Sequence, residues 1–277
     1  MNRMTPTQSL DDDKLTVVGD FVWLLHRHKL NAFEDFFGER VGTLLRDVGP
    51  RSNVLLTLEA DRGTRHFFLK RHAPLPFGHK LLCVLRLRRP RTPARVEWEN
   101  IGHLAKLGIP TMSPVALGED PESGRSFIMT AEIEDASPAD DFAREHLTGD
   151  DARNRRREFA RRLGALVRKL HAARLTHRDL YLCHVFVREV DGGFQLHLID
   201  LQRLGPRLFA RRWKVKDVAQ LAHSRPPGTF TRTDAMRFLH AYFDLRRLDR
   251  PRKRFVASVG RKVKRMRRHL AAGEDRS

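Results

Sequence analysis

The strongest constraint on this 277-residue chain is one block, His177–Val185, with the sequence HRDLYLCHV. The block follows a leucine-rich run that ends at Leu170, and a short apolar segment that ends in Asp200 comes after it. A carboxylate in such a loop can orient an attacking hydroxyl, and a second one at a strand end can bind a metal ion. Asp179 and Asp200 stand about 20 residues apart, which fits the two carboxylates of a phosphoryl-transfer site.

The charge of the chain favours polyanionic partners. Lys and Arg number 53 and Asp and Glu number 34, so the formal excess is 53 − 34 = +19. Nucleic acid, an anionic membrane face and a phosphorylated substrate all fit such an excess. We do not expect nucleic acid, because neither an aromatic stacking pattern nor a recognised binding module is present.

Other compositional features point to a soluble protein in a reducing compartment. Apolar residues make up 40% of the chain, and no run is long enough to span a bilayer. The first 14 residues lack the apolar core of a secretory signal, so we expect a cytoplasmic location. Cys83 and Cys183 are the only cysteines and give neither a disulfide framework nor metal-ligand spacing.

The order of predicted elements indicates an α+β fold of two lobes. The first 50 residues carry mixed helical and irregular signals. Strands are expected near residues 53–59, 65–70, 113–117 and 126–129, with a helix over about 94–107. A polar stretch, 132–141, is the candidate hinge. A helix spaced through Phe159 and Leu170 and two strands near 185–187 and 194–199 follow, and the remainder is mostly helical. We therefore expect a β-rich N-terminal lobe over 1–131 and a helical C-terminal lobe over 132–277.

Two residues of the N-terminal lobe are candidates for binding a nucleotide. Lys70 ends a strand whose alternation puts it on the same face as Phe68, where its ammonium group can meet phosphates. Glu97 shares the apolar face of its helix with Ile101 and Leu104. A carboxylate on a buried face needs a partner, and Lys70 is the natural one. The bland alternatives are a solvated strand-end lysine and a solvated glutamate at the edge of the face.

The remaining candidates follow from the same chemistry. We expect Asp179 to aim the acceptor hydroxyl and take its proton, and Asp200 to hold Mg²⁺. Backbone groups of the hinge near Glu132 and Ile133 should meet the adenine of ATP. These residues come in the order that a two-lobed, protein-kinase-like fold requires, and we expect them to meet in one cleft.

The segment Thr176–Val187 resembles the catalytic loop of bacterial lipopolysaccharide core kinases of the heptose-kinase (WaaP/InaA) type. Further segments that are similar to blocks of that family are Phe67–His72, Glu97–Glu99, Leu198–Arg203 and Lys216–Leu221. The resemblance implies transfer of a phosphoryl group from Mg-ATP to the first heptose of the inner core. The acceptor would be a lipid A–core glycolipid precursor, and the enzyme would lie peripherally on the inner face of the inner membrane.

Departures from ordinary protein kinases leave some points open. His184 stands where a metal-binding Asn is usual, so it either binds the metal or fixes the loop by hydrogen bonds. Asp200 is followed by Leu-Gln, no A-P-E block follows, and a G-x-G-x-x-G loop is missing. These features favour a glycolipid or small-molecule kinase over a protein kinase. The alternatives are a kinase acting on Kdo, whose relatives tend to have Asn at this place, a soluble kinase of the aminoglycoside type, and an inactive kinase fold that serves as a binding module.

The C-terminal segment 252–270 predicts a basic amphipathic helix. Val256, Val259, Val263, Met266 and Leu270 follow helical spacing, and basic residues fill the positions between them. Such a helix can bind an anionic membrane surface, or its apolar stripe can dock on the C-terminal lobe while the basic face stays solvated. The basic connection 80–95 is a second site that could meet lipid phosphates or be a solvated loop.

Overall fold

The chain forms two compact units. The computed structural model describes residues 6–38, 41–61, 63–74 and 91–274. Unit 1 comprises Met1–Lys106 and Met112–Ile133, and unit 2 comprises Leu107–Thr111 and Glu134–Ser277. The boundary between Ile133 and Glu134 falls within the polar stretch 132–141.

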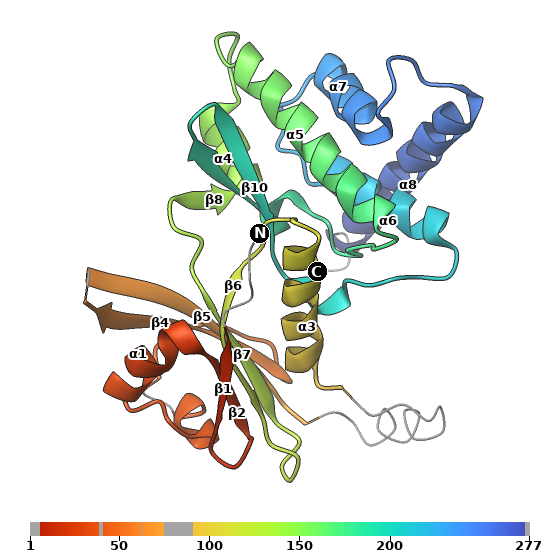
Figure 1. The fold of residues 1–277 in the computed structure, drawn as a ribbon. Helices are drawn as coiled ribbons and strands as arrows, with labels where there is room; N and C mark the ends of the chain where they lie inside the picture. The colour runs from red at the N-terminus through yellow and green to blue at the C-terminus, as the bar shows by residue number, and fades with distance from the viewer. Residues whose placement is uncertain (1–5, 39–40, 62, 75–90, 275–277) are drawn as a thin grey trace. The chain divides into compact units, whose positions relative to one another are not determined.

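Unit 1 is built on an antiparallel sheet (Figure 1). Its seven strands have the order β1-β2-β6-β7-β5-β4-β3. The strands are β1 (Thr7–Leu10), β2 (Leu15–Val18), β3 (Thr43–Asp47), β4 (Arg51–Ala60), β5 (Gly63–His72), β6 (Ser113–Glu119) and β7 (Ser126–Ala131). The helices are α1 (Val22–Arg27) and α3 (Pro93–Lys106), with short 3₁₀ turns at Gly19–Phe21 and Phe33–Phe36.

Alternation along β5 divides the sheet into two covered faces. Phe67 and Leu69 are fully buried in an aromatic core with Phe36 and Phe127, whose rings stack at 4.2 Å. Lys70 points to the opposite face, where α3 packs on β5, β6 and β7. The two strands that alternation predicted near 53–59 and 65–70 are confirmed, and so is the helix over about 94–107.

The prediction for the first 50 residues was incomplete, because β1, β2 and β3 belong to the sheet. β1 and β2 have only four residues each and turn through Asp11, Asp12 and Asp13, all with positive φ. β3 is exposed along its whole length, so its sequence shows no alternation of apolar and polar residues. Short or exposed strands leave no periodic signal, which explains the error.

Unit 2 is mainly helical. Its helices are α4 (Ala139–His146), α5 (Arg153–Ala172), α6 (Ala210–His223), α7 (Arg232–Phe243) and α8 (Arg250–Glu274). Its small antiparallel sheet has the order β10-β9-β8, formed by β8 (Ala136–Pro138), β9 (Val185–Val190) and β10 (Gly193–Leu198). Two 3₁₀ turns, Leu182–His184 and Leu201–Arg203, flank β9 and β10. The predicted α+β class, with a β-rich first part and a helical second part, is confirmed.

Helix α5 is the centre of unit 2 and packs along α7, as Figure 1 shows. Its Phe159, Leu163, Val167 and Leu170 are buried, as their spacing predicted. Gly164 permits the close approach of α7, since a Cβ added there would lie 2.4 Å from the carbonyl oxygen of Phe238.

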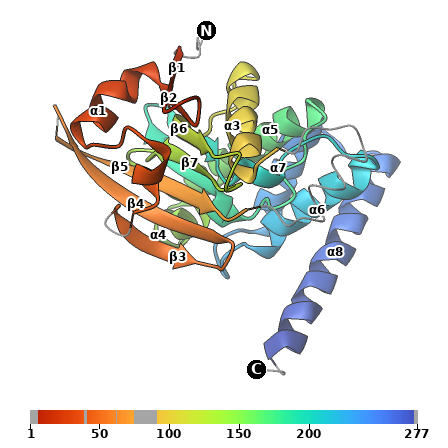
Figure 2. The ribbon, with the colours of Figure 1, turned by 90° about the horizontal axis from the view of Figure 1, so that it is seen from below.

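The first half of helix α8 packs on the rest of unit 2. Phe255 and Val259 are buried, and the Phe255 ring stacks on Tyr242 at 5.8 Å. Helix α8 also lies along α6 (Figure 2). The exposed side chains of its second half include Arg261, Lys264, Arg265, Arg267 and Arg268. The stripe therefore docks at Val259 while the basic face is exposed, and this arrangement is compatible with both alternatives.

Two further expectations concern the basic connection 80–95 and membrane-spanning segments. Most of the basic connection 80–95, including Cys83, lies outside the described residues, whereas Arg91 pairs with Glu99 at 2.8 Å. Among the helices within the described ranges, none combines the length and apolar character that crossing a bilayer requires.

Candidate active site

The loop that carries Asp179 is fixed by one buried carboxylate. Asp217 of α6 is fully buried and accepts hydrogen bonds from the backbone N–H of His177 at 2.9 Å and of Arg178 at 2.8 Å. Arg178 has φ +74°, a left-handed conformation that costs free energy in a residue with a side chain. The two bonds to Asp217 hold the strained turn in place. Asp217 therefore has a structural role, since it bonds the catalytic loop to α6.

A histidine and a tyrosine extend this anchor into α5 and α7. The Nε2 of His171 lies 3.1 Å from Asp217 Oδ2, and its Nδ1 lies 2.8 Å from the hydroxyl of Tyr242. Burial lowers the pKa of His171, although Asp217 opposes this shift. The neutral ring therefore donates from Nε2 to Asp217 and accepts from Tyr242. Burial also raises the pKa of Tyr242, which keeps its hydroxyl protonated as the donor.

Asp179 is surrounded by donors. Arg203 Nη1 lies 2.8 Å from its Oδ2, and Lys216 Nζ lies 3.8 Å from its Oδ1. The amide of Gln220 donates to Oδ1 at 3.5 Å. Lys216 also donates to the carbonyl of Arg178, and burial lowers its pKa despite the opposing effect of Asp179. The carboxylate is about one-fifth exposed, at 22%, so it is both oriented and accessible.

Asp200 follows the end of β10 in a strained conformation. It has φ +56° and ψ +63°, and its side chain is partly exposed. The fully buried His177 donates from Nε2 to the carbonyl of the preceding Ile199 at 2.9 Å. Because a carbonyl can only accept, this bond fixes the tautomer of His177, whose pKa is lowered by burial. The catalytic loop thus holds the backbone that presents Asp200.

His184 connects the two carboxylates. Its Nδ1 lies 2.7 Å from the carbonyl oxygen of Asp179, and its Nε2 lies 3.9 Å from Asp200 Oδ2. Burial alone would lower the pKa of His184. Hydrogen bonds to Cys183 and to the Asp179 carbonyl, together with Asp200, outweigh burial and raise it to about 9.

These residues fit a divalent cation. The Nδ1 bond makes Nε2 the atom that faces Asp200, so a carboxylate oxygen and an imidazole nitrogen point at one position. Within the described ranges, no group of three His, Cys, Asp or Glu side chains forms a complete metal cage. The Asp200 carboxylate suits an ion that takes its other ligands from phosphates and water, as Mg²⁺ does, and His184 can join it only after Nε2 has lost its proton.

In unit 1, the predicted ion pair is present. Lys70 Nζ lies 2.6 Å from Glu97 Oε1. Glu97 is fully buried on the same face of α3 as Ile101 and Leu104. The pair joins β5 to α3. Glu99, by contrast, lies on the exposed face of α3.

Glu132 and Ile133 directly follow β7 and belong to no helix or strand. The N–H of Glu132 donates to the carbonyl of His66 in β5 at 3.0 Å. The carbonyl of Glu132 and the backbone of Ile133 are therefore the groups to consider for a nucleotide base.

Sequence reasoning did not assign roles to Arg203, Lys216 and Gln220. The spacing could have identified two of them, since Lys216 and Gln220 are four residues apart on α6 and flank the buried Asp217. Arg203 reaches Asp179 from a 3₁₀ turn, for which the sequence carries no periodic signal.

The fold and these two arrangements define a protein-kinase-like phosphotransferase. Phosphoryl transfer in that class uses a strand lysine paired with a helix glutamate, a carboxylate in a loop, and a second carboxylate at the end of the next strand. A solved structure described as WaaP in complex with acyl carrier protein is similar, with a TM-score of 0.67 and 28% identity. The similarity covers 91% of this chain and 98% of that one.

The chain belongs to the lipopolysaccharide kinase (Kdo/WaaP) family, whose model matches residues 53–242. It is similar to the lipopolysaccharide core heptose(I) kinase WaaP of Pseudomonas aeruginosa, with 32% identity over 76% of this chain and 82% of the relative. The Escherichia coli protein of that name is 31% identical over 74% of this chain and 80% of the relative. A 3-deoxy-D-manno-octulosonic acid kinase of Actinobacillus succinogenes is 25% identical over 48% of this chain and 53% of the relative. A kinase of this family uses ATP and acts on lipopolysaccharide.

Proposed function

We propose that this protein phosphorylates a heptose hydroxyl of the lipopolysaccharide inner core, with Mg-ATP as the donor. The observation that carries the proposal is the loop 177–184. It presents Asp179 on an anchor of Asp217 and sets His184 against Asp200. An inactive kinase fold would not need to keep a partly exposed carboxylate amid three donors.

Within unit 2, Asp179 is the group that orients the acceptor hydroxyl and accepts its proton. Arg203 and Lys216 contact this carboxylate and hold it in position for that role. Asp200 and His184 would hold Mg²⁺, with His184 binding through Nε2 once that atom has lost its proton. The cation supplies charge neutralisation at the phosphates when bound.

Within unit 1, the Lys70–Glu97 pair would bind nucleotide phosphates. Glu97 fixes the ammonium group on the face of the sheet that α3 covers. The carbonyl of Glu132 and the backbone of Ile133 would meet the adenine. These roles rest on the pairing in this structure and on the chemistry of kinases.

The test is transfer of labelled γ-phosphate from ATP to core-truncated lipopolysaccharide. Asp179→Asn should lower kcat by at least about 100-fold while the protein stays folded, because the amide cannot accept the proton. Asp191→Asn, an exposed turn residue between β9 and β10, is the matched control and should keep full activity. Unchanged turnover in Asp179→Asn would remove Asp179 from the proposed role.

Heptose is favoured over Kdo as the acceptor. The heptose(I) kinases match three-quarters of this chain, whereas the Kdo kinase matches about half. Acceptors that end at Kdo and acceptors that carry the first heptose separate the two. Phosphorylation of the Kdo-terminated acceptor alone would overturn the choice of heptose.

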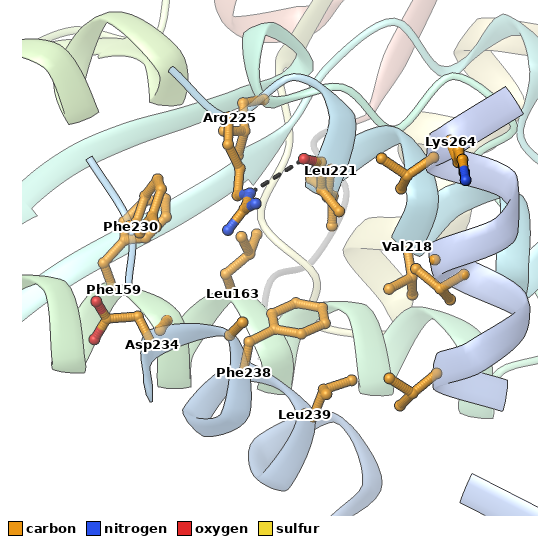
Figure 3. Close-up of a pocket in the computed structure, with 18 of the residues that line it drawn as sticks. Phe159, Leu163, Val218, Leu221, Arg225, Phe230, Asp234, Phe238, Leu239 and Lys264 are labelled. Carbon is orange, nitrogen blue, oxygen red and sulfur yellow. Dashed lines mark hydrogen bonds between the residues drawn. The ribbon is translucent and has the colours of Figure 1, made fainter. Parts of the chain in front are cut away.

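We also propose an acyl carrier protein as a partner, because unit 2 contains a largely apolar pocket of about 580 Å³ (Figure 3). Its walls come from α5, α6, α7 and α8, and include Phe159, Leu163, Val218, Phe238 and Val259. The basic residues Arg225, Lys264 and Arg267 also line the pocket. An apolar pocket with basic groups suits an acyl chain delivered by an acidic carrier.

Calorimetry with acylated and unacylated carrier tests this partner. The acylated form should bind more tightly, and the variant Lys264→Glu/Arg267→Glu, at two exposed positions, should weaken its binding at least tenfold. Equal affinity for both forms of the carrier would exclude the pocket as an acyl site.

A peripheral location on the cytoplasmic face of the inner membrane completes the proposal. The exposed basic side chains of α8 that do not line the pocket, among them Arg261, Arg265 and Arg268, suit an anionic leaflet. Since Phe255 and Val259 are part of the core, the contribution of α8 should be tested by charge substitution and not by deletion.

A further inference from the structure

The loop between Leu201–Arg203 and α6 exposes two large apolar side chains. Leu208 is 85% exposed and Phe209 is 83% exposed, whereas the next most exposed large apolar side chain in the described part of the chain, Leu44, is 57% exposed. The two residues are adjacent at the N-terminus of α6. A folded protein in water gains nothing from exposing such a pair, so a partner is indicated.

The backbone holds these side chains outward. Phe209 has φ +56° and ψ +45°, a left-handed conformation that is unfavourable for an aromatic residue. Its carbonyl accepts the N–H of Arg212 at 2.9 Å, which fixes it to the first turn of α6. Strain that the surrounding structure maintains is typical of functional segments.

The base of this loop is attached to the catalytic loop. Gly205 and Thr176 exchange two backbone hydrogen bonds, at 3.1 and 3.2 Å. Thr176 directly precedes His177, and Gly205 stands three residues before Leu208. The ring of Trp213, in the first turn of α6, lies under the guanidinium of Arg178 at 5.1 Å. The loop that carries Leu208 and Phe209 is therefore bonded directly to the loop that carries Asp179.

The charge around the tip has one sign. Residues 201–216 contain Arg203, Arg207, Arg211, Arg212, Lys214 and Lys216 and no acidic residue. Arg207, Arg211 and Arg212 are exposed and stand on both sides of the apolar pair. Apolar tips flanked by arginines match the acyl and phosphate layers of an anionic bilayer. A protein partner would instead require a shaped surface, and two adjacent side chains on a loop offer none.

We infer that Leu208 and Phe209 insert into an anionic lipid bilayer, with Arg207, Arg211 and Arg212 on lipid phosphates. The loop thereby presents Asp179 to an acceptor anchored in that bilayer. This second step rests on the proposed function, whereas insertion itself does not.

The first experiment measures binding to vesicles of phosphatidylglycerol and phosphatidylethanolamine. Leu208→Ser/Phe209→Ser should bind at least tenfold more weakly than the unmodified protein, and the difference should persist at 0.5 M salt because insertion is not screened. Leu44→Ser/Leu45→Ser removes two exposed leucines from β3 and should bind normally. By contrast, Arg265→Ser/Arg268→Ser in α8 should bind more weakly than the unmodified protein at low salt only, because salt screens the attraction of these arginines to the lipid. Equal binding by the 208/209 variant would overturn the inference, and a changed oligomeric state with equal binding would assign the pair to contacts between copies.

The second experiment measures depth. In Phe209→Trp, vesicles of brominated lipid should quench fluorescence more strongly than in the unmodified protein, whose Trp23, Trp98 and Trp213 give the background. No added quenching would show that the loop stays outside the acyl layer and would also overturn the inference.

A third measurement separates this inference from the proposed function. Leu208→Ser/Phe209→Ser should phosphorylate membrane-embedded lipopolysaccharide at least tenfold more slowly and a deacylated core oligosaccharide at the normal rate. If the unmodified protein phosphorylates neither acceptor, the proposed function fails while the vesicle results stand. If both rates fall together in the variant, the loop acts on catalysis and not through lipid.

Discussion

At the scale of the residue, Asp217 determines the geometry of the candidate site. A single buried carboxylate accepts from two loop amides and from His171. Asp179 can point at an acceptor only while this anchor holds the strained Arg178 turn. A second buried carboxylate, Glu97, fixes Lys70 in the same way within unit 1.

Asp217→Asn is expected to destabilise the protein by about 2–4 kcal/mol and to lower kcat at least tenfold. An amide group would replace one acceptor with a donor that faces backbone N–H groups, and burial prevents water from compensating. Urea unfolding and the kinase assay, carried out below the unfolding transition, measure the two effects.

Asp244→Asn is the matched control. Asp244 is 76% exposed and pairs with Arg168, so its loss should cost less than about 1 kcal/mol. Asn also tolerates the left-handed conformation of this C-cap. If both variants lose the same stability, Asp217 is not the anchor that the distances indicate.

The sequence predicted much of the site because its residues lie at positions with a strong local signal. Glu97 was assigned from helical spacing, and its pairing with Lys70 was inferred from the cost of burying a lone charge. Arg203 and the Tyr242–His171 contact could not be inferred, since the partners are 24 and 71 residues apart and meet only in the folded chain.

At the scale of the element, close helix packing distinguishes two glycines. Gly164 lies where α5 meets α7, whereas Gly260 lies in α8, where an added Cβ would have no neighbouring atom within 4 Å. The two positions look alike in the sequence, because each is a glycine within a helix.

Gly164→Ala should destabilise the protein by about 1–3 kcal/mol, because its Cβ would meet the Phe238 carbonyl and force the helices apart. Gly260→Ala should stabilise it by about 0.5–1 kcal/mol through helix propensity. Urea midpoints measure both changes. A neutral Gly164→Ala would contradict the close contact between α5 and α7.

Elements were predictable where burial alternates or follows helical spacing. Strands β4 and β5 and helices α3 and α5 satisfy this condition. Strand β3, exposed throughout, and the four-residue β1 and β2 do not. For α8, spacing predicted the helix, but only the burial of Phe255 and Val259 shows that its first half docks.

At the scale of the whole molecule, buried histidines make stability depend on pH. Burial lowers the pKa of His171 and His177, so the unfolded chain binds protons that the folded chain excludes. Their contribution to stability is complete above the unfolded value of about 6.5 and is lost as the pH falls below it.

The free energy of unfolding should therefore fall by about 1 kcal/mol or more per pH unit between pH 6.5 and 5.0. His197, whose pKa is also lowered by burial, adds to the same slope. Asp120, whose pKa hydrogen bonds from Ser123 lower to about 2, loses its contribution only below about pH 4. His184, with its pKa raised to about 9, contributes fully throughout.

Urea titrations at the two pH values measure this slope. His171→Gln removes one of the three buried histidines that titrate in this window and should reduce the slope by about a third. An identical slope in that variant would exclude His171 as a source of the pH dependence.

The contact between Tyr242, His171 and Asp217 has a consequence for genetic screens. One chain of hydrogen bonds holds α5, α6 and α7 together and also fixes the conformation of the loop that carries Asp179. Selection for stability and selection for turnover therefore act on the same side chains. Temperature-sensitive alleles should therefore accumulate at positions 171, 217 and 242, whereas alleles that are inactive at every temperature should accumulate at position 179.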